Sequence, residues 1–302
     1  MRRRNGAGHV LAQRVGPIVL GQSIAAAWPR QIRLTRTEFF ALLAILGCAN
    51  GFFARALQTV HDVGWSSAIV GTFGVSAIVW IACFIGLSEL LEHKSETTQS
   101  LRYGDWVLGA GFLFLISLPM GQFSWLALTA LGLYILAFAN EQSSLRRGAV
   151  ILLAITVPML WSRILFNLFA NILLEVDASL TARLLGTSHS GNMVRFANGD
   201  GYLVVLPACS SVANMSLAFL CWITLSVWLR HRWSASDLLW GFLACTSVAA
   251  VNVGRLSLMG LNQEIFEIVH GPWGDAAANF AMLSLALGFT ALGLRHELVS
   301  RA

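Results

Sequence analysis

The sequence predicts an all-α polytopic membrane protein with about eight transmembrane helices. Of its 302 residues, 56% are hydrophobic and only 12% are charged, whereas a soluble domain carries roughly 25% charged residues. A membrane-spanning helix needs about 20 mostly apolar residues, and several such stretches follow one another along the chain. This composition excludes a soluble protein with a single anchor. The net charge of +5 does not indicate nucleic-acid binding, because the basic residues gather in short segments between apolar stretches.

The apolar stretches define eight expected spans. The third and fourth are short and are joined at Pro119-Met120-Gly121, which predicts a tight helical hairpin or two tilted helices. We expect a single transmembrane domain over 37–302, preceded by a basic segment, 1–36, in the cytoplasm or on the membrane surface. The expected spans are Glu38–Leu57, Ser67–Leu91, Trp106–Met120, Phe123–Asn140, Gly148–Leu174, Ser210–Leu229, Leu238–Gly260 and Ala277–Leu294.

The distribution of charge predicts the orientation of these spans. Cytoplasmic loops of membrane proteins carry an excess of Lys and Arg. With both termini inside, most of the 20 basic residues fall in inner segments, and the outer loops hold only Arg183 and Arg195. We therefore expect a multi-pass protein of the cell inner (cytoplasmic) membrane with both termini cytoplasmic.

The long outer segment before the sixth span is expected to be structured. Leu180, Leu184 and Leu185 form an amphipathic helical pattern that ends at Gly186. Two apolar runs flanking Asn198-Gly199-Asp200-Gly201 predict a small β-hairpin. Together they predict a helix/β-hairpin insertion on the outer face, which leads the chain to the start of the sixth span.

Cys209 stands at that start and is the candidate nucleophile. A helix N-terminus favours negative charge, and therefore the thiolate form of a cysteine. The alternative is a buried Cys that packs beside Ala208 and Val212. The other four cysteines lie within apolar spans without CxxC spacing, which is typical of small core residues: Cys48, Cys83, Cys221 and Cys245.

Two arginines lie within spans, where charged residues are costly and usually face a cavity or a partner. Arg255 lies about six residues below the outer end of the seventh span, or roughly 9 Å into the membrane. The alternative for Arg255 is that its side chain reaches the outer headgroups. Asn252 lies one turn deeper on the same face, where it can bond a guanidinium or a substrate amide. Arg163 lies nearer the middle of the fifth span, where a structural pairing is as plausible as a functional role.

His270 lies in the outer segment that follows Arg255, beside Gly271 and Pro272, which predict a turn. A surface histidine usually has no catalytic role. An alternative metal site made from His61, His189, His270 and Asp200 has no ligand spacing to support it. We therefore predict no metal and no other cofactor.

Cys209, Arg255 and His270 are expected at one membrane face, and together they fit acyl transfer. A thiolate attacks a peptide carbonyl, an imidazole takes and returns the proton, and an arginine stabilises the oxyanion. The product is a thioester acyl-enzyme, which water or an amine resolves. Asn252, Ser210 and Arg163 are the candidate substrate-binding residues.

Residues 178–280 resemble the exosortase/archaeosortase family of membrane-embedded cysteine transpeptidases. The resemblance rests on short motifs taken in order, with their spacing and topology: Ala178-Ser179-Leu180, Leu185-Gly186, the hairpin, Ala208-Cys209-Ser210, Asn252-Val253-Gly254-Arg255 and His270 to Gly274. One departure is clear. The family often has glycine and arginine where this chain has Ser211 and Ala213, which leaves the substrate motif and the subfamily open.

The resemblance implies a thiol protease or transpeptidase that acts at the outer face of the membrane. Cys209 would be the nucleophile, His270 the acid/base and Arg255 the oxyanion or substrate-positioning group. The implied partners are exported proteins with a C-terminal sorting signal, made of a short motif, a hydrophobic span and a basic tail, together with membrane lipids. No nucleic acid is expected.

Two other interpretations stay open at the level of sequence. A transporter or an exopolysaccharide-assembly protein would use Arg163 and Arg255 to line a polar path, and it would function without the thiol. A membrane scaffold would need no chemistry at all.

Overall fold

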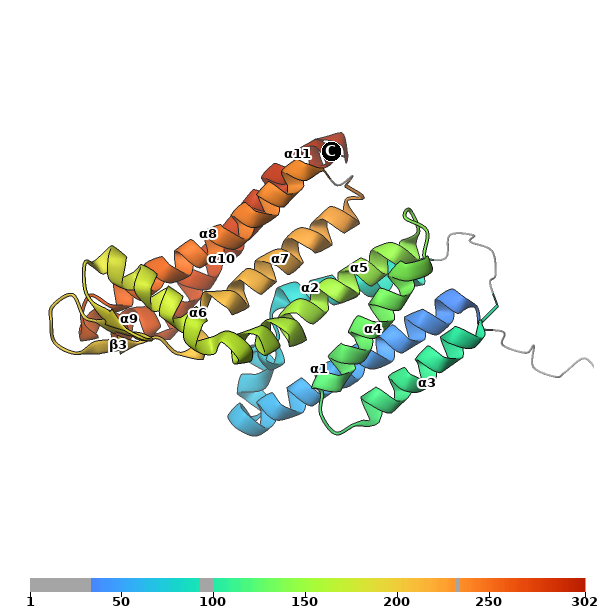
Figure 1. Cartoon of the computed structure of the whole chain (residues 1–302), viewed down its shortest axis with the longest axis horizontal. Helices are drawn as coiled ribbons and strands as arrows, with labels where there is room; N and C mark the ends of the chain where they lie inside the picture. Colours follow the sequence, from blue (N-terminus) through green and yellow to red (C-terminus); the bar gives the residue numbers. More distant parts are fainter. Residues whose placement is uncertain (1–33, 93–99, 232–233, 302) are drawn as a thin grey trace, which may run out of the picture. The chain divides into compact units, whose positions relative to one another are not determined.

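The computed structural model describes residues 34–92, 100–231 and 234–301. The predicted N-terminal segment 1–36 falls mostly outside these residues, as do Lys94 and Arg232 of the predicted inner segments. The described chain is mostly helical, with three short strands, and Figure 1 shows the order of the elements. Thr35–Ala302 forms one compact unit.

The first apolar helix is longer than the sequence predicts. Helix α1 (Arg36–Val70) begins at a capping box in which Thr35 accepts the amide hydrogen of Glu38. It continues past the expected end of the first span to Val70, with a break at Gly64, where φ is +79°. The predicted span Ser67–Leu91 is therefore wrong in its first part, because residues 67–70 complete α1. After a 3-10 turn η1 (Thr72–Gly74), α2 (Ala77–Leu91) begins.

Helices α3 (Tyr103–Ser117) and α4 (Gln122–Phe138) pack against each other and are joined by the short turn that holds Pro119. The turn lies close to α1. A Cβ added at Gly121 would come within 2.7 Å of the Ala54 Cβ. Only glycine allows this approach, which brings the N-terminus of α4 against α1.

The fifth predicted span is part of one long helix. Helix α5 (Ser144–Thr156), the π-helical turn η2 (Val157–Trp161) and α6 (Ser162–Leu185) form a continuous helix of 42 residues. Pro158 lies in the π-helical turn and has no amide hydrogen to donate to the helix ladder. The helix ends at Gly186 in the left-handed conformation (φ +66°), as the sequence predicts. The predicted end at Leu174 is wrong, because the amphipathic stretch before Gly186 belongs to the same helix.

A three-stranded antiparallel sheet follows α6. Strand β2 pairs with both neighbours, and Val194 faces Leu203 across the β2–β3 pair. Both side chains are buried, which fixes the register because a slip by one residue would expose them. The sheet leads the chain into the 3-10 turn η3 (Pro207–Cys209). The strands are β1 (His189–Ser190), β2 (Met193–Arg195) and β3 (Tyr202–Val204).

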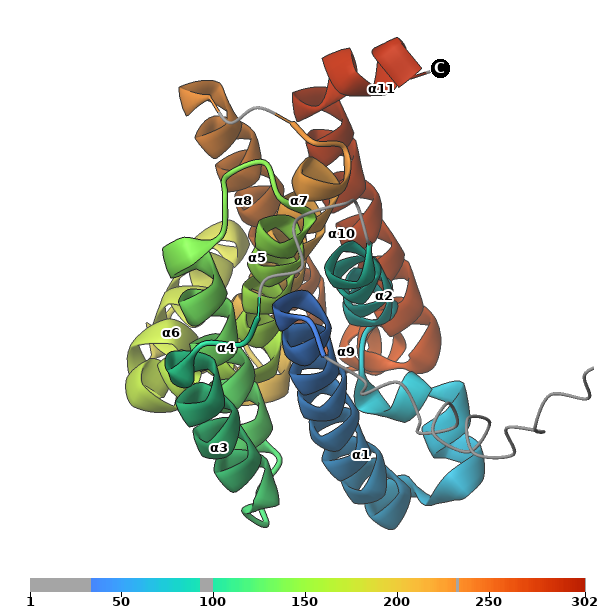
Figure 2. The ribbon, with the colours of Figure 1, turned by 90° about the vertical axis from the view of Figure 1, so that its right-hand side faces the viewer.

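The C-terminal part of the chain is helical throughout its described residues. Helices α8 and α10 lie side by side, and α7 packs against both, as Figures 1 and 2 show. The segment expected outside between the last two spans is largely helical, since residues 263–270 form a helix and the next helix begins at Pro272 instead of Ala277. The two helices are separated at Gly271, where the sequence predicts a turn. The helices are α7 (Ser211–Trp228), α8 (Ala235–Met259), α9 (Gln263–His270), α10 (Pro272–Gly293) and α11 (Arg295–Arg301).

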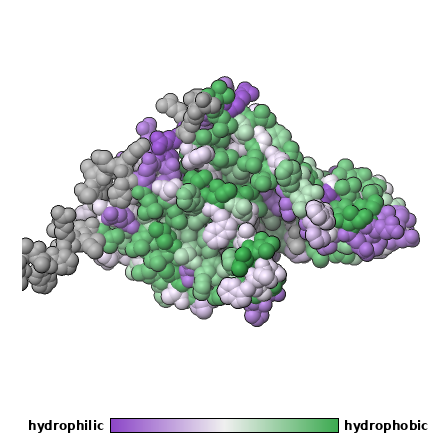
Figure 3. Space-filling model, turned by 180° about the vertical axis from the view of Figure 1, so that it is seen from behind, coloured by the Kyte–Doolittle hydropathy of each residue, from purple (hydrophilic) through white to green (hydrophobic). Residues whose placement is uncertain are grey.

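Five helices in the described part of the chain are long and apolar enough to cross a membrane: α1, the continuous α5–α6 helix, α7, α8 and α10. Helices α2, α3 and α4 are apolar but shorter. Many large hydrophobic side chains on these helices are exposed, such as Phe84 and Phe114. Hydrophobic residues cover most of the face in Figure 3. A surface of this kind is expected where helices face lipid.

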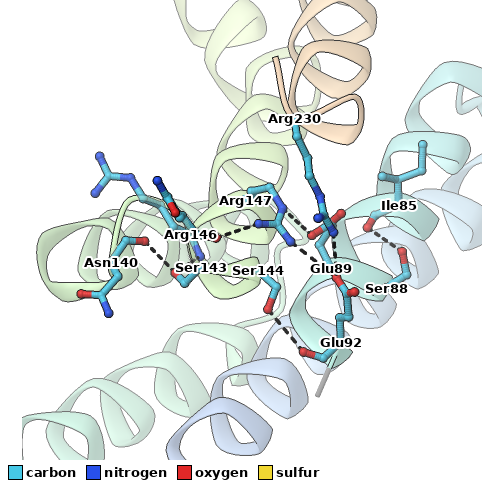
Figure 4. A network of polar contacts seen from close by, with 11 residues as sticks. Ile85, Ser88, Glu89, Glu92, Asn140, Ser143, Ser144, Arg146, Arg147 and Arg230 are labelled. Atoms are coloured by element: carbon cyan, nitrogen blue, oxygen red, sulfur yellow. Dashed lines mark hydrogen bonds and ion pairs between the residues drawn. The ribbon is translucent and has the colours of Figure 1, made fainter. Parts of the chain in front are cut away.

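One end of the helical unit is held by paired charges, and we name it the paired end. Arg147 at the start of α5 donates to Glu89 at 2.7 Å and to Glu92 at 3.5 Å, and Arg230 lies 3.9 Å from Glu92. Figure 4 shows these residues converging from α2, α5 and the end of α7. Arg36, Asp105 and His231 belong to the paired end as well: Arg36 binds Asp105 with both side chains buried, and His231 lies between Asp237 and Glu297.

Candidate functional site

Cys209 lies at the opposite end, which we name the Cys209 end. It is the last residue of η3, and Ser210 then caps α7 by accepting the amide hydrogen of Val212. The turn is anchored by a small core that contains Cys209, buried residues of α6 and α8 and the inward side chains of the sheet. Cys209 is 8% exposed. The thiol therefore lies at the N-terminus of a long apolar helix, just beneath the surface.

Asp177 binds the first residue of α7. Its carboxylate accepts hydrogen bonds from the Ser211 amide at 3.0 Å and from the Ser211 hydroxyl at 2.8 Å. Asp177 and Ser211 are each 5% exposed. A carboxylate at this position satisfies a free amide at the helix start and is stabilised by the helix dipole. It therefore ties α6 to the turn that carries Cys209.

Asn252 of α8 also binds the turn that carries Cys209. Its side-chain amide donates to the Cys209 carbonyl at 2.7 Å and to the Ser211 hydroxyl at 3.1 Å. Asn252 is 1% exposed, and a buried amide bonded in this way fixes the geometry of its partners. Asn252, a predicted substrate-binding residue, is thus engaged with the chain's own backbone beside Cys209.

Arg255 follows Asn252 by three residues on α8, so the two lie on one face about 4.5 Å apart along the axis. Its guanidinium forms a short ion pair with Asp275 in the first turn of α10. The Arg255 side chain is 15% exposed, whereas Asp275 is 49% exposed. The Arg255 Nε atom is buried and has no hydrogen-bond partner among the described residues. The Arg255 guanidinium is therefore paired with Asp275 through one nitrogen, while its Nε hydrogen remains unbonded among the described residues.

His270 is the last residue of α9 and is exposed. Its ring stacks on Phe266, with centroids 5.2 Å apart and planes inclined by 17°. Phe266 and Val269 in turn pack against the core that contains Cys209. Within the described chain, no hydrogen bond joins the Cys209 thiol to His270 or to Arg255. Cys209 therefore shares one small core with Leu256, the neighbour of Arg255, and with Phe266 and Val269 of the helix that ends at His270.

The structure separates Arg163 from this site. Arg163 lines a cavity with Arg55 of α1, on the side of the α5–α6 helix that faces the turn before α4. Ser210 remains next to Cys209, where its hydroxyl caps α7. Among the described residues, no group of three His, Cys, Asp or Glu side chains is placed to hold a metal ion, and the suggested set of His61, His189, His270 and Asp200 does not converge.

No family model, curated protein or solved structure matches this chain. The resemblance to the exosortases and archaeosortases therefore rests on the sequence motifs alone.

Two acidic residues of the site were not predicted from the sequence. Asp177 lies in an apolar helix, 34 residues before its partner Ser211. Asp275 lies 20 residues after Arg255. The signal for Asp177 was an acidic residue beside the small side chains of Ala178 and Thr181, one position before the segment that resembles the transpeptidase family. Its partner could be found only once the fold was known.

Proposed function

We propose that this protein is a membrane-embedded cysteine transpeptidase or protease that resembles the exosortases and archaeosortases. It would cleave C-terminal sorting signals of exported proteins at the outer face of the membrane. The observation that carries the proposal is the position of Cys209, which lies at the N-terminus of α7 in a turn fixed by Asp177 and Asn252. Such a turn holds the thiol in a constant position at the start of a helix.

The proposed topology has eight crossings. The five long helices are joined by α2, α3 and α4, which cross as shorter or tilted helices. The paired end then faces the cytoplasm, in keeping with its arginines at positions 36, 147 and 230. The Cys209 end, with the sheet and α9, faces outward. There the cleavage site of a substrate anchored by its own span would meet the thiol.

The proposed reaction is acyl transfer. The Cys209 thiol gives its proton to His270, and its sulfur attacks a peptide carbonyl to form a C–S bond. Arg255 donates hydrogen bonds to the resulting oxyanion, and its unpartnered Nε is the donor free for this role. The C–N bond then breaks, and His270 returns the proton to the leaving amine. Water or an amine finally releases the acyl group from the thioester.

This chemistry requires a movement at α9. His270 is on the exposed side of a helix of eight residues, between Asn262 and Gly271. A shift of α9 on substrate binding would bring the imidazole to the thiol, since catalytic hydrogen bonds often form only in the substrate complex. The proposal thus predicts that substrate orders this helix against the Cys209 turn.

The test is a processing assay in cells that make this protein with a co-encoded protein carrying a C-terminal signal. Cys209→Ala should abolish cleavage, while Cys245→Ala, which changes a partly buried cysteine of α8, should leave it intact. Arg255→Ala and His270→Ala should reduce cleavage strongly, and His189→Ala, which removes an exposed histidine of β1, should not. Normal cleavage by a folded Cys209→Ala protein would refute thiol catalysis and favour a transporter or a scaffold.

A further inference from the structure

A second polar site lies where α1, the α3–α4 turn and the α5–α6 helix meet. It is a cavity of about 280 Å³ lined by Arg55, Gln58, Gln122 and Arg163, together with Trp125 and Met159. The side chains that line it share no member with the turn of Cys209. The cavity therefore calls for its own explanation.

The two arginines of this cavity lack acidic partners. No hydrogen bond or ion pair joins Arg55 or Arg163 to any described residue, and the Arg55 Nε atom is buried without a partner. Both arginines line the same cavity, so their like charges repel each other. Arg55 is half-buried and Arg163 is exposed, so both guanidinium groups can be reached from outside. Two like charges that share a cavity without an acid favour an anion between them.

The N-terminus of α4 adds to the positive potential. Gly121 and Gln122, which begin α4, line the cavity, and Gly121 caps the helix without any side-chain hydrogen bond. The amides of Phe123 and Ser124 donate to the carbonyls of Met120 and Gly121, whereas those of Gly121 and Gln122 have no backbone partner among the described residues. The helix dipole favours negative charge at this end. The close approach of Gly121 to Ala54 holds this helix end against α1.

Helix geometry places the cavity at one depth. Arg55 follows Arg36, at the start of α1, by 19 positions, and Arg163 follows Ser144, at the start of α5, by 19 positions. At 1.5 Å per residue, each arginine lies about 28 Å from the paired end. That distance is close to the roughly 30 Å thickness of a bilayer core. In the proposed topology, the cavity lies at the level of the outer headgroups.

We propose that Arg55, Arg163 and the N-terminus of α4 bind a phosphate group, carried either by a phospholipid headgroup of the outer leaflet or by free phosphate. Arginine forks match phosphate oxygens in paired hydrogen bonds, and the amides of Gly121 and Gln122 supply further donors. The apolar side chains beside them can contact the glycerol and the first carbons of a lipid.

The contrast with other arginines of the chain supports this assignment. Arg36, Arg147 and Arg255 each have a carboxylate within ion-pair distance. Arg55 and Arg163 come from helices far apart in sequence, and they meet in a cavity whose described lining has no acidic residue. We therefore expect a ligand to neutralise the charges of Arg55 and Arg163.

The test uses the full-length protein purified in a non-ionic maltoside detergent. Its thermal unfolding is followed with dihexanoyl-phosphatidylglycerol, with inorganic phosphate, and with uncharged dioctanoylglycerol. Either phosphate compound should raise the melting temperature, and dioctanoylglycerol should not. A response to the lipid alone identifies a headgroup site, and an equal response to both identifies a site for the free anion.

Two variants make the test decisive. The double variant Arg55→Gln, Arg163→Gln should melt at the same or a higher temperature without ligand, because a repulsion is removed. It should bind the effective phosphate compound about tenfold more weakly or worse. Arg183→Gln, an exposed change on α6 beside Glu175, should bind as wild type does. No response to either phosphate compound, or equal binding by the double variant, would overturn the proposal.

Discussion

The two ends of the helical unit differ in the partners of their charged side chains. At the paired end, each arginine named above meets a carboxylate, and Asp105 is fully buried beside Arg36. At the Cys209 end, Arg255 pairs with Asp275, but no ion pair joins Asp177 to a described basic side chain, and Asp177 binds the start of α7 instead. In the separate cavity between α1 and α6, Arg55 and Arg163 have no acid among the described residues. The difference indicates that ion pairs stabilise the paired end, and the less completely paired groups elsewhere are the ones to which we assign the proposed ligand sites.

The largest effect on stability is expected from Asp105→Ala. It would leave the Arg36 guanidinium buried without its bidentate partner, so the free energy of unfolding should fall by about 3–5 kcal/mol. Thermal or denaturant unfolding in detergent measures the change. Tyr134→Phe is the matched control, because it removes one hydrogen bond to the same carboxylate, worth about 1 kcal/mol. An Asp105→Ala protein as stable as the control would contradict the structural role of the paired end.

A change of Asp177 should affect activity more than stability. Asp177→Ala removes two hydrogen bonds that fix the start of α7 beside Cys209, so processing of a sorting signal should fall about tenfold or more. Cleavage rates, measured on equal amounts of folded protein, provide the test. Asp200→Asn changes an exposed carboxylate in the turn between β2 and β3 and should be neutral. If the Asp177→Ala protein cleaves at the wild-type rate, the turn does not position the nucleophile.

A smaller effect is expected from pH at the paired end. Burial lowers the pKa of His231, but hydrogen bonds with Glu297 and Asp237 outweigh it, so the pKa is raised above its usual value of 6.5. The stabilisation is therefore complete below about pH 6.5 and is lost as the pH rises through the raised pKa. Its size should be about 1 kcal/mol or less. Melting temperatures across pH 5–9 should fall in the wild type more than in His231→Asn, and parallel curves would contradict the assignment.

The sequence predicted the helices better than their ends. Apolar runs are visible without a structure, and so is the stop at Gly186, because a left-handed helix end favours glycine. The extension of the α5–α6 helix beyond Leu174 was missed because the expected length of a span ended the helix there. Helix α9 was not predicted because it has only eight residues and lies in the outer segment between two spans.

Only local relations within the candidate site could be predicted from the sequence, and its long-range contacts could not. Position along a helix placed Arg255 one turn from Asn252, because helical spacing is local information. The link from Asp177 to Ser211 spans 34 residues, and the meeting of Arg55 with Arg163 spans more of the chain. Such contacts depend on how the helices pack, which cannot be predicted from the sequence pattern of a single helix.

Trapping the acyl-enzyme tests the central claim most directly. The full-length protein in membranes is given a substrate with a C-terminal signal, the reaction is quenched in acid, and the peptide containing Cys209 is analysed by mass spectrometry. The account predicts a substrate fragment joined to Cys209 through a bond that neutral hydroxylamine cleaves, present in the Cys245→Ala protein and absent from Cys209→Ala. Substrate cleavage without any adduct on Cys209, and undiminished in Cys209→Ala, would contradict it.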